Sequence, residues 1–415
     1  MRHRGTWHAV AVAAATIVLA ACGGQEKGDL PAPAPVTLPT AAEPPSPRAP
    51  DGPDNERPRW TAPFDDVPRT AGETFIGLGF PADDNADLSI SGVSPEGETR
   101  WAVRTNPSCV GYGVTDVVGT PAAVILASDA DARDGTLATR ITANAYDVRD
   151  GRRLWGPSPV PGSLLGPGLI FGTATPSVVG GSQGERVMLA ARSGQPVRPP
   201  AEDARPLYEH HGTGLFGSEG AVTAVDTAAG SVSWNSDRIP APPGFGTGPR
   251  HVELLDSIPA SSANVVALRW THPDERSAST ALHDLGTGRL IADLGDQAEP
   301  RTSVDHQAGA VVVSGLDQYR TIRAFDIGTG AELWRDDDAK PLEITLVHDG
   351  TAHGTRSGRS VTIDVRTGNT LASGDWPVPV AAAADVLIAP LPPRPEAGPS
   401  GRTAGEGPDY IAYGK

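Results

Sequence analysis

Lysine and cysteine are scarce in this chain of 415 residues. Lys27, Lys340 and Lys415 are the only lysines, so arginines supply nearly all of the 34 basic residues, which face 50 acidic ones. The net charge of −16 argues against a nucleic-acid binder, because such a protein needs a basic surface to neutralise phosphates. Cys22 and Cys109 are too few for a disulfide framework or for a zinc site built on cysteines.

Long apolar runs and helical patterns are also lacking. The single long run, from Ala9 to Ala21, has 13 residues, whereas a membrane-spanning helix needs about 20. The 49 glycines and 41 prolines make up about 22% of the chain, against a usual level of about 12%. Turns therefore interrupt the chain too often for a helical bundle, and we expect no long amphipathic helix after residue 22.

The N-terminus has the pattern of an export signal. Arg2 and Arg4 precede the apolar run, which ends in Leu19-Ala-Ala-Cys22. This tetrad resembles the bacterial lipobox, in which the cysteine thiol receives a diacylglycerol and becomes the first residue of the mature chain. The resemblance implies a signal peptide over 1–21 and a protein anchored through Cys22 to the lipid bilayer on the extracytoplasmic side of the cell membrane. An ordinary signal peptide that ends in cysteine is the alternative.

Proline dominates the segment that follows. Ten of the 28 residues from Pro31 to Pro58 are prolines, mixed with Ala, Ser, Asp and Glu. This composition cannot bury a core, and it favours an extended chain. We therefore predict a disordered tether over 22–57, which includes the lipidated cysteine, and one folded domain over 58–415.

A nine-residue pattern, Asp-x-x-x-Gly-x-x-x-Trp, recurs along the rest of the chain. Its three complete copies are Asp147-Gly151-Trp155, Asp226-Gly230-Trp234 and Asp326-Gly330-Trp334. Four weaker copies keep the glycine, and these are Asp284-Gly288-Ala292, Asp364-Gly368-Ala372, Val93-Gly97-Trp101 and Ala190-Gly194-Arg198. The seven glycines are about 45 residues apart on average, which is the length of a four-stranded propeller blade.

The chemistry of the pattern suits a hairpin between the last two strands of a blade. The aspartate can accept hydrogen bonds from backbone N–H groups in the turn, and the glycine supplies a positive φ. The tryptophan can fill the gap between neighbouring blades while its N–H reaches a carbonyl. Around the third complete copy, the alternation predicts strands over 310–314, 321–326 and 331–334.

The two ends of the chain predict how the ring closes. Residues 409–415 reach the turn before an outer strand, and the missing tryptophan half of the pattern appears at Trp60. We therefore expect Trp60 on the outer strand of the last blade, which removes free sheet edges. The length from Pro58 to Lys415 favours an all-β propeller with eight blades of four antiparallel strands, and seven blades are the alternative.

The segment Ala324 to Trp334 resembles the tryptophan-docking motif of pyrroloquinoline-quinone-type propellers, A-x-D-x-x-T-G-x-x-x-W. The segments Ala145 to Trp155 and Ala224 to Trp234 match this motif less completely, and the resemblance covers nearly all of the predicted domain. The family has non-catalytic members, which include a lipoprotein of the outer-membrane barrel-assembly machine and sensor domains outside bacterial kinases. The resemblance implies the fold but not the quinone cofactor.

Catalytic members of that family often carry an adjacent Cys-Cys pair, and a calcium ion near a catalytic aspartate. Cys109 is alone, and no segment of this chain matches those sites, so we expect no catalytic residue and no cofactor. Trp270 could stack on a flat cofactor, but we expect it to be a partly exposed strand residue. Cys109 is expected to be a small buried core residue, with a reactive thiol as the alternative.

No metal site is expected either. His210 and His211 would need a third ligand from another blade. Neighbouring residues of a strand also point to opposite faces of the sheet, which makes it awkward for both rings to bind one metal ion.

Acidic residues gather in the predicted connections between second and third strands and in the links between blades. These connections lie on the face of a propeller opposite the Asp–Gly turns. The candidate binding rim comprises Asp83, Asp84, Asp87, Asp129, Asp131, Asp134, Asp274, Glu275, Asp336, Asp337 and Asp338. An irregular rim on a rigid ring suits a binding face, and solvated loops that keep an exported protein soluble are an equal alternative.

The sequence therefore predicts a membrane-anchored, extracytoplasmic propeller lipoprotein. It is expected to bind an unidentified protein partner through the face that carries the acidic rim, to bind no nucleic acid and to catalyse no reaction. A quinone-dependent propeller enzyme and a ligand-sensing propeller are the alternatives.

Overall fold

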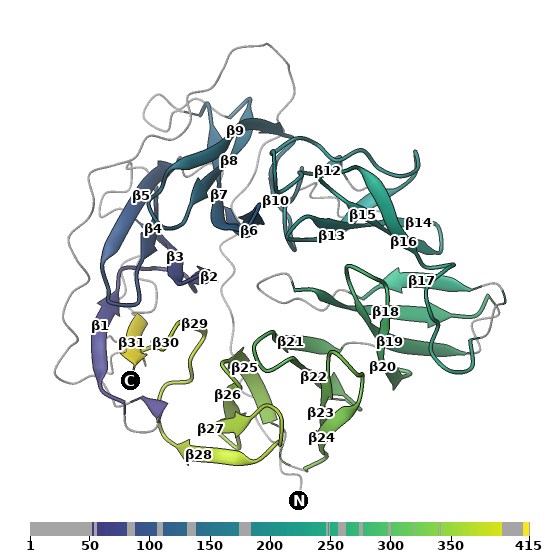
Figure 1. Ribbon diagram of the computed structural model, residues 1–415. Helices are drawn as coiled ribbons and strands as arrows, with labels where there is room; N and C mark the ends of the chain where they lie inside the picture. Colours follow the sequence, from purple (N-terminus) through teal and green to yellow (C-terminus); the bar gives the residue numbers. More distant parts are fainter. Residues whose placement is uncertain are drawn as a thin grey trace, which may run out of the picture.

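Strands alone make up the secondary structure that the computed structural model describes. The described residues are 52–53, 56–80, 88–105, 111–130, 138–173, 184–245, 248, 250–255, 263–273, 277–297, 300–318, 320–338, 340, 342–391 and 410–414. Within them, no helix is long and apolar enough to cross a membrane. Eight small antiparallel sheets form the blades of a ring (Figure 1), which confirms the predicted eight-bladed all-β propeller.

The first four blades follow one another along the chain. Blade 1 consists of β2 (Arg69–Ala71), β3 (Thr74–Gly79), β4 (Leu88–Val93) and β5 (Thr99–Thr105). Blade 2 consists of β6 (Tyr112–Val117), β7 (Thr120–Ser128), β8 (Ile141–Asp147) and β9 (Arg153–Val160). Blade 3 consists of β10 (Ser163–Leu164), β11 (Ile170–Gly172) and β12 (Arg186–Met188). Blade 4 consists of β13 (Arg205–His210), β14 (Thr213–Ser218), β15 (Ala221–Asp226) and β16 (Ser231–Asn235).

The remaining four blades complete the ring. Blade 5 consists of β17 (His251–Leu254), β18 (Val265–Thr271), β19 (Ala278–Asp284) and β20 (Leu290–Gly295). Blade 6 consists of β21 (Arg301–Asp305), β22 (Ala310–Leu316), β23 (Thr321–Asp326) and β24 (Glu332–Asp336). Blade 7 consists of β25 (Leu342–His348), β26 (Thr351–Arg356), β27 (Arg359–Asp364) and β28 (Thr370–Gly374). Blade 8 consists of β29 (Ala381–Ala383), β30 (Val386–Pro390), β31 (Tyr410–Gly414) and β1 (Pro58–Ala62).

Blade 8 joins the first and the last of the described strands. The first strand, β1, pairs antiparallel with the last strand, β31, and places Trp60 opposite Ala412. Figure 1 shows the purple β1 beside the yellow β31. Trp60 is 5% exposed and its ring meets the ring of Phe75 in blade 1 edge-on, with centroids 6.0 Å apart. The predicted closure of the ring by an N-terminal strand in the last blade is confirmed.

Blade 3 is thinner than the other blades. Its described residues form three strands, and a single bridge between Leu189 and Pro196 stands where a fourth strand would run. Prolines at 196, 199 and 200 have no backbone N–H to give to a strand ladder. The predicted four strands per blade are present in the other seven blades.

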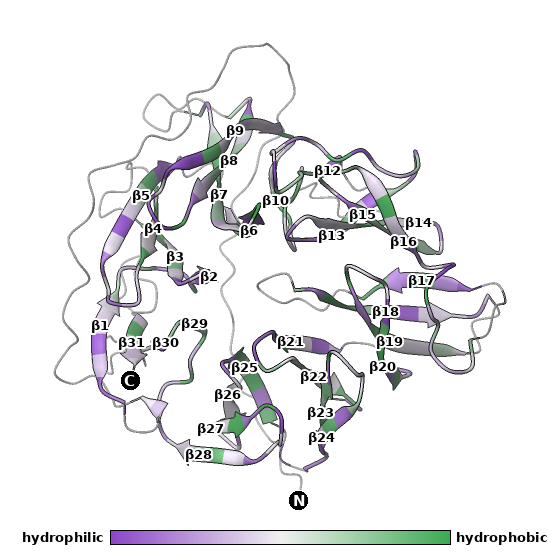
Figure 2. Ribbon diagram, in the orientation of Figure 1, coloured by the Kyte–Doolittle hydropathy of each residue, from purple (hydrophilic) through white to green (hydrophobic). Residues whose placement is uncertain are grey.

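The middle strands of the blades are buried on both faces, because neighbouring blades cover both sides of each sheet. In β22, Ala310, Val311, Val312 and Val313 are at most 1% exposed, whereas the outer strand β24 of the same blade is half-buried or exposed throughout. Figure 2 shows apolar and polar stretches alternating along the strands. Small β-branched side chains and alanines suit this tight spacing between sheets.

The strand predictions for blade 6 are close to the observed bounds. The predicted strands over 310–314, 321–326 and 331–334 correspond to β22, β23 and β24. The predicted signal peptide, Cys22 and most of the predicted tether lie outside the described residues, and so does Cys109.

Candidate binding face

Antiparallel strands place the connections of each blade alternately on two faces of the ring. One face, here called the turn face, carries the Asp–Gly turns between third and fourth strands. The opposite face, here called the loop face, carries the hairpins between second and third strands and the links from one blade to the next.

The aspartates of the repeat hold the turns of the turn face. Asp326 Oδ1 accepts hydrogen bonds from the backbone N–H and the hydroxyl of Thr329, both over 2.9 Å. The Gly330 N–H donates to the Asp326 carbonyl over 2.8 Å, and Gly330 has a φ of +75°. Asp284 and Asp364 hold their turns through a threonine in the same way. These three turns share one hydrogen-bond pattern, which occupies Oδ1 of each aspartate.

Five tryptophans close joints between blades. Each indole N–H donates to a backbone carbonyl of the following blade over 2.7–3.0 Å: Trp60 to Pro95, Trp101 to Val148, Trp155 to Ala191, Trp234 to Leu285 and Trp334 to Val365. Each ring also lies on the glycine of the next Asp–Gly turn, so that a Cβ there would come within 3.0 Å of the indole; these glycines are Gly97, Gly151, Gly194, Gly288 and Gly368. The close approach and the positive φ both require glycine.

Most of the candidate acidic rim lies outside the described residues. The residues concerned are Asp83, Asp84, Asp87, Asp131, Asp134, Asp274 and Glu275. Asp129 is described, and its carboxylate accepts hydrogen bonds from Thr139 and from Arg140, with which it forms an ion pair. Burial alone would raise the pKa of Asp129, but these hydrogen bonds hold it below its ordinary value. The charge of Asp129 is therefore used within blade 2.

The acidic run between blades 6 and 7 is also partly neutralised within the chain. Asp336 forms an ion pair with Arg356 of blade 7. Asp337 accepts hydrogen bonds from Arg335, over 2.7 and 2.8 Å, and from Thr321, and these bonds lower its pKa. Asp338 accepts a backbone hydrogen bond from Lys340. The described part of the rim thus presents less free negative charge than its sequence indicates.

A pocket of about 790 Å³ opens on the loop face between blades 4 and 5. Its walls come from the start of β13, the β14–β15 hairpin and the start of β17, together with the β18–β19 hairpin and Arg186 of blade 3. We call it the interblade pocket. Because three blades contribute to it, its shape depends on the assembled ring.

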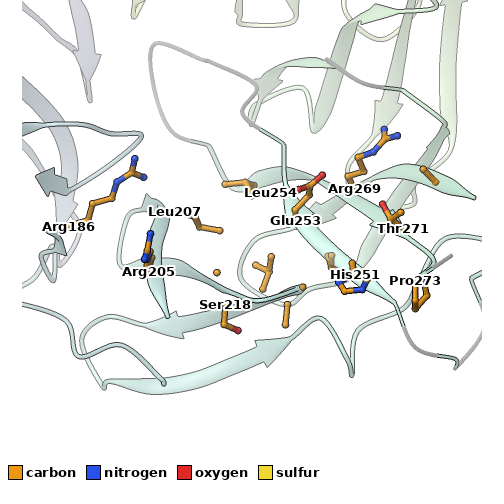
Figure 3. Close-up of a pocket in the computed structure, with 16 residues that line it drawn as sticks. Arg186, Arg205, Leu207, Ser218, His251, Glu253, Leu254, Arg269, Thr271 and Pro273 are labelled. Atoms are coloured by element: carbon orange, nitrogen blue, oxygen red, sulfur yellow. The ribbon is translucent and has the colours of Figure 1, made fainter. Parts of the chain in front are cut away.

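Arginines give the interblade pocket a positive character. Figure 3 shows Arg186 and Arg205 at one end, and Arg269, Glu253 and His251 at the other. Arg269 is held in place, because its guanidinium donates to the Asp296 carboxylate over 2.9 Å and to the Gln297 carbonyl over 3.1 Å. Within the described part of the chain, neither the Arg186 nor the Arg205 guanidinium has an ion-pair or hydrogen-bond partner. Three guanidinium groups and the Glu253 carboxylate therefore line the pocket, and two of the three guanidinium groups are unpaired, in a protein that is strongly acidic as a whole.

Apolar side chains form the base of the same pocket. Leu207, Val222 and Val252 line it, and the last two are at most 2% exposed. His251 packs over Gly220, where a Cβ would come within 2.4 Å of the His251 Nδ1. An apolar floor with unpaired guanidinium groups at the edge can bind an anionic group that carries a short apolar stem.

Sequence reasoning missed this pocket. Its arginines lie in three blades: Arg186 and Arg205 begin their strands, Arg269 lies within β18, and none has a motif around it. Only the eight-bladed geometry brings residues 186, 205 and 269 to one opening. A sequence signal was available only in the excess of arginine over lysine, which does not locate a site.

Trp270 is more deeply buried than the sequence analysis predicts. It is 0% exposed and lies in the core between blades 4 and 5, so the prediction of a partly exposed strand residue was wrong. The Arg250 guanidinium lies 4.8 Å from the centre of its ring, and the His283 ring is 5.6 Å away. A buried indole covered in this way is not available as a platform for a flat cofactor.

His210 and His211 were expected to point apart, and this was also wrong. Their rings stack with centroids 3.9 Å apart, because His211 begins the turn with a φ of +44° and so breaks the alternation of the strand. Burial, together with the neighbouring His211 and His306, lowers the pKa of His210 to about 3. Among the described residues, no group of three or more His, Cys, Asp and Glu side chains is placed to hold a metal ion.

Glu209, the neighbour of these histidines, is a buried carboxylate that links two blades. Its Oε2 accepts a hydrogen bond from the Leu169 N–H of blade 3 over 2.8 Å, and its Oε1 accepts one from the Gly212 N–H over 2.9 Å. Burial raises the pKa of Glu209 to about 7, although both hydrogen bonds oppose the change. The carboxyl group thus ties blade 3 to blade 4 close to the axis of the ring.

One family model matches part of the chain. Residues 218–383 match the family of the outer membrane protein assembly factor BamB. No protein with a curated description matches the chain. Among solved structures, the chain is similar to BamB from Moraxella catarrhalis, with 18% identity, a TM-score of 0.42, and coverage of 86% of this chain and 99% of that one.

Two further solved structures are similar to the chain over the same 86% of its length. One is the computationally designed Ika8 protein, with 13% identity, 97% of its chain covered and a TM-score of 0.44. The other is the quinohemoprotein alcohol dehydrogenase ADHIIG from Pseudomonas putida HK5, with 11% identity, 76% of its chain covered and a TM-score of 0.42. Likeness at this level carries no information on activity or partners.

Proposed function

We propose that this chain is a lipoprotein scaffold that binds a protein partner on the extracytoplasmic side of a membrane. The family match runs from blade 4 into blade 8, and it names an assembly factor, which supports a protein-binding role rather than a catalytic one. The rigid ring is a suitable platform, since its joints are fixed by tryptophans and its two faces differ in regularity.

The interblade pocket is the proposed contact site, and the observation that carries this proposal is its pair of unpaired arginines. Arg186 and Arg205 stand at the edge of a pocket with an apolar floor. Arginine matches a carboxylate with two parallel hydrogen bonds, so a partner segment with an acidic residue beside an apolar one fits the pocket. This partner chemistry differs from the basic partner that an acidic rim would recruit.

Photo-crosslinking in living cells tests the proposed contact. A photoreactive amino acid at Glu219, in the hairpin beside the pocket, is expected to give a discrete crosslinked product. The same residue at Asp150, an exposed carboxylate of the turn face, is the matched control and is expected to give none. Equal products from both positions, or no product from either, would contradict a partner on the loop face.

Charge reversal separates specific recognition from mere proximity. Arg186→Glu with Arg205→Glu should reduce the crosslink at Glu219 about tenfold or more, since a hydrogen bond to a charged group is worth about 1.5–3 kcal/mol. Arg153→Glu with Arg192→Glu, at exposed positions away from the pocket, changes the net charge equally and should leave the product intact. Loss of the crosslink in both double variants would mean that net charge, not the pocket, attracts the partner.

Anchoring rests on the Leu19-Ala-Ala-Cys22 tetrad, which lies outside the described residues. Cys22→Ser removes the thiol that would receive the lipid. We expect the variant to leave the membrane fraction, whereas Cys109→Ser, the matched control, should stay there. A Cys22→Ser protein that still needs detergent for extraction would contradict the lipoprotein assignment.

The absence of catalysis is also part of the proposal. The buried position of Trp270 removes the one aromatic platform that the sequence offered for a quinone. A visible absorbance band in the purified protein, together with calcium-dependent dehydrogenase activity, would overturn it in favour of a quinone enzyme.

A further inference from the structure

Among the seven turns that carry a repeat glycine, the turn of blade 4 is the one whose glycine no other described residue covers. Of the seven repeat glycines, all of which are described, five lie under a tryptophan, and Gly330 lies under the Ile291 carbonyl. Gly230 has no atom within 4 Å of the position its Cβ would take, and residues 228–233 are all exposed. The space over the repeat glycine is therefore filled in six blades and empty in blade 4.

The cause is a substitution in blade 3. The bridge between Leu189 and Pro196 corresponds in the repeat to the pairing of Phe325 with Glu332, which puts Arg198 at the position of Trp334. Arg198 is exposed and has no partner within the described residues. The previous blade thus supplies no indole to the turn of blade 4.

The groups that would receive an indole are still present. In the five filled joints, the indole N–H donates to a carbonyl two or three residues before the glycine. The equivalent carbonyl in blade 4 belongs to Thr227, and no described residue donates to it. Val232, which follows on the same outer strand, is 52% exposed. We call the Thr227 carbonyl and Gly230 the blade 4 slot.

This chain has no tryptophan left to fill the slot. Five of its eight tryptophans dock in other joints, Trp270 is buried, and Trp376 lies against Gly374. The eighth, Trp7, belongs to the predicted signal peptide. In a second copy of the mature chain the same five tryptophans are docked, Trp270 is buried and Trp376 is half-buried against Gly374, so no fully exposed indole is on offer among the described residues. We therefore take the occupant to be a tryptophan of a different protein.

We propose that the blade 4 slot binds a tryptophan side chain of a protein partner, which lies on Gly230 and donates its indole N–H to the Thr227 carbonyl. The proposal rests on the proposed protein-binding function, and it adds a contact on the turn face that does not involve the interblade pocket. The five intrachain joints show the geometry that the partner residue would reproduce.

The probe is a six-residue peptide with the sequence of Ala331–Asp336, in which 5-fluorotryptophan replaces the tryptophan. On addition of the mature protein, the ¹⁹F signal of the peptide should shift and broaden. Two variants should abolish this effect. Arg198→Trp restores the missing indole in blade 3 and fills the slot from within, and it should raise Tm by several degrees. Gly230→Ala places a methyl group where the ring would lie; because Gly230 has a φ of +67°, this variant also strains the turn, and its Tm should be compared with that of the parent protein.

Arg198→Ala is the matched control, and it should leave both the ¹⁹F effect and Tm unchanged. Line broadening that survives in Arg198→Trp and Gly230→Ala would place the peptide elsewhere and overturn the proposal, as would the absence of any effect with the unaltered protein. The result is independent of the crosslink at Glu219, so failure of the slot and failure of the loop-face contact are distinguishable.

Discussion

Two joints of the ring hold neighbouring blades together through different contacts: the joint between blades 1 and 2, and the joint between blades 3 and 4. At the first, Trp101 is 4% exposed, covers Gly151 and donates to the Val148 carbonyl, so the joint is sealed at its outer edge. At the second, the outer edge is open, and the buried Glu209 carboxyl group holds the two inner turns together. Stability of the ring is therefore distributed unevenly around its circumference, and the open joint is the one free to take on another role.

The largest expected effect on stability comes from removing β1, the strand that closes the ring. A chain that begins at Val67 lacks β1, and with it Trp60, which seals the joint between blades 8 and 1, and Phe64, whose ring lies over Gly77. Loss of Trp60 alone is worth about 3–5 kcal/mol, and the uncovered edge of β31 adds a site for aggregation. Thermal unfolding should show a much lower Tm or no folded protein.

The control for this truncation is a chain that begins at Asp51, which keeps β1 and should melt like the full mature chain. Equal Tm values for the two truncated chains would show that β1 does not close the ring in solution.

Single tryptophan changes should rank the sealed joints. Trp101→Ala removes a buried indole and should cost about 3–5 kcal/mol of unfolding free energy, measured by urea denaturation. Trp334→Ala should cost less, because Trp334 is only half-buried in the joint between blades 6 and 7. Arg198→Ala, at the corresponding position of the open joint, should change stability by no more than about 0.5 kcal/mol. Equal costs at all three positions would remove the distinction between sealed and open joints.

The open joint should respond to pH through Glu209. Its folded pKa of about 7 lies above the ordinary value of 4.5, so the folded protein holds a proton that the unfolded chain has lost. Its contribution to stability is full below pH 4.5 and is lost as pH rises to about 7, on the order of 3 kcal/mol in total.

Buried histidines act in the opposite sense over part of this range, so the comparison must be with a variant. Burial lowers the pKa of His210, of His283 and of His353 below 6.5, and these residues cost stability as pH falls. Unfolding of the parent protein and of Glu209→Gln should therefore be compared at pH 5 and pH 8. The advantage of the parent over the variant should be greater at pH 5. A difference that does not change with pH would mean that Glu209 is ionised at both values.

The smallest effect is expected from the acidic residues between blades 6 and 7. Asp336→Asn, Asp337→Asn and Asp338→Asn together break the partly buried pair of Asp336 with Arg356 and the exposed pair of Asp337 with Arg335. Ion pairs near the surface contribute about 0–1 kcal/mol each, so Tm should fall by a few degrees at most. If the acidic rim rather than the interblade pocket recruits the partner, this triple variant should abolish the crosslink at Glu219 while Arg186→Glu with Arg205→Glu preserves it.

The ring could be predicted from the sequence because its signals are local and periodic. One glycine every 45 residues or so gave the blade length, and Trp60 supplied the half-motif absent near residue 414. The residues of each copy lie within nine positions of one another, so the repeat can be recognised from one sequence.

The candidate site could not be predicted, because it depends on what the closed ring brings together. Arg186, Arg205 and Arg269 meet only through the packing of three blades. The partners of Asp336 and Asp337 were equally invisible, since Arg356 lies in the next blade and strand register decides which charges meet. The stacked pair His210 and His211 escaped prediction because one positive φ reverses the direction of a side chain.

The pairing of β1 with β31 also sets the order in which the molecule can be completed. These two strands lie about 350 residues apart in the chain, so they meet only after every other blade has been synthesised, and such distant contacts form slowly. Until then β1 is an unpaired strand with a free edge; it begins with Pro58 and is followed by Pro63, and these prolines limit the partners that it can accept. The strand that closes the ring is therefore synthesised before all the blades and paired after them. Between these two events its free edge is exposed to other chains, and protection by a chaperone would matter most.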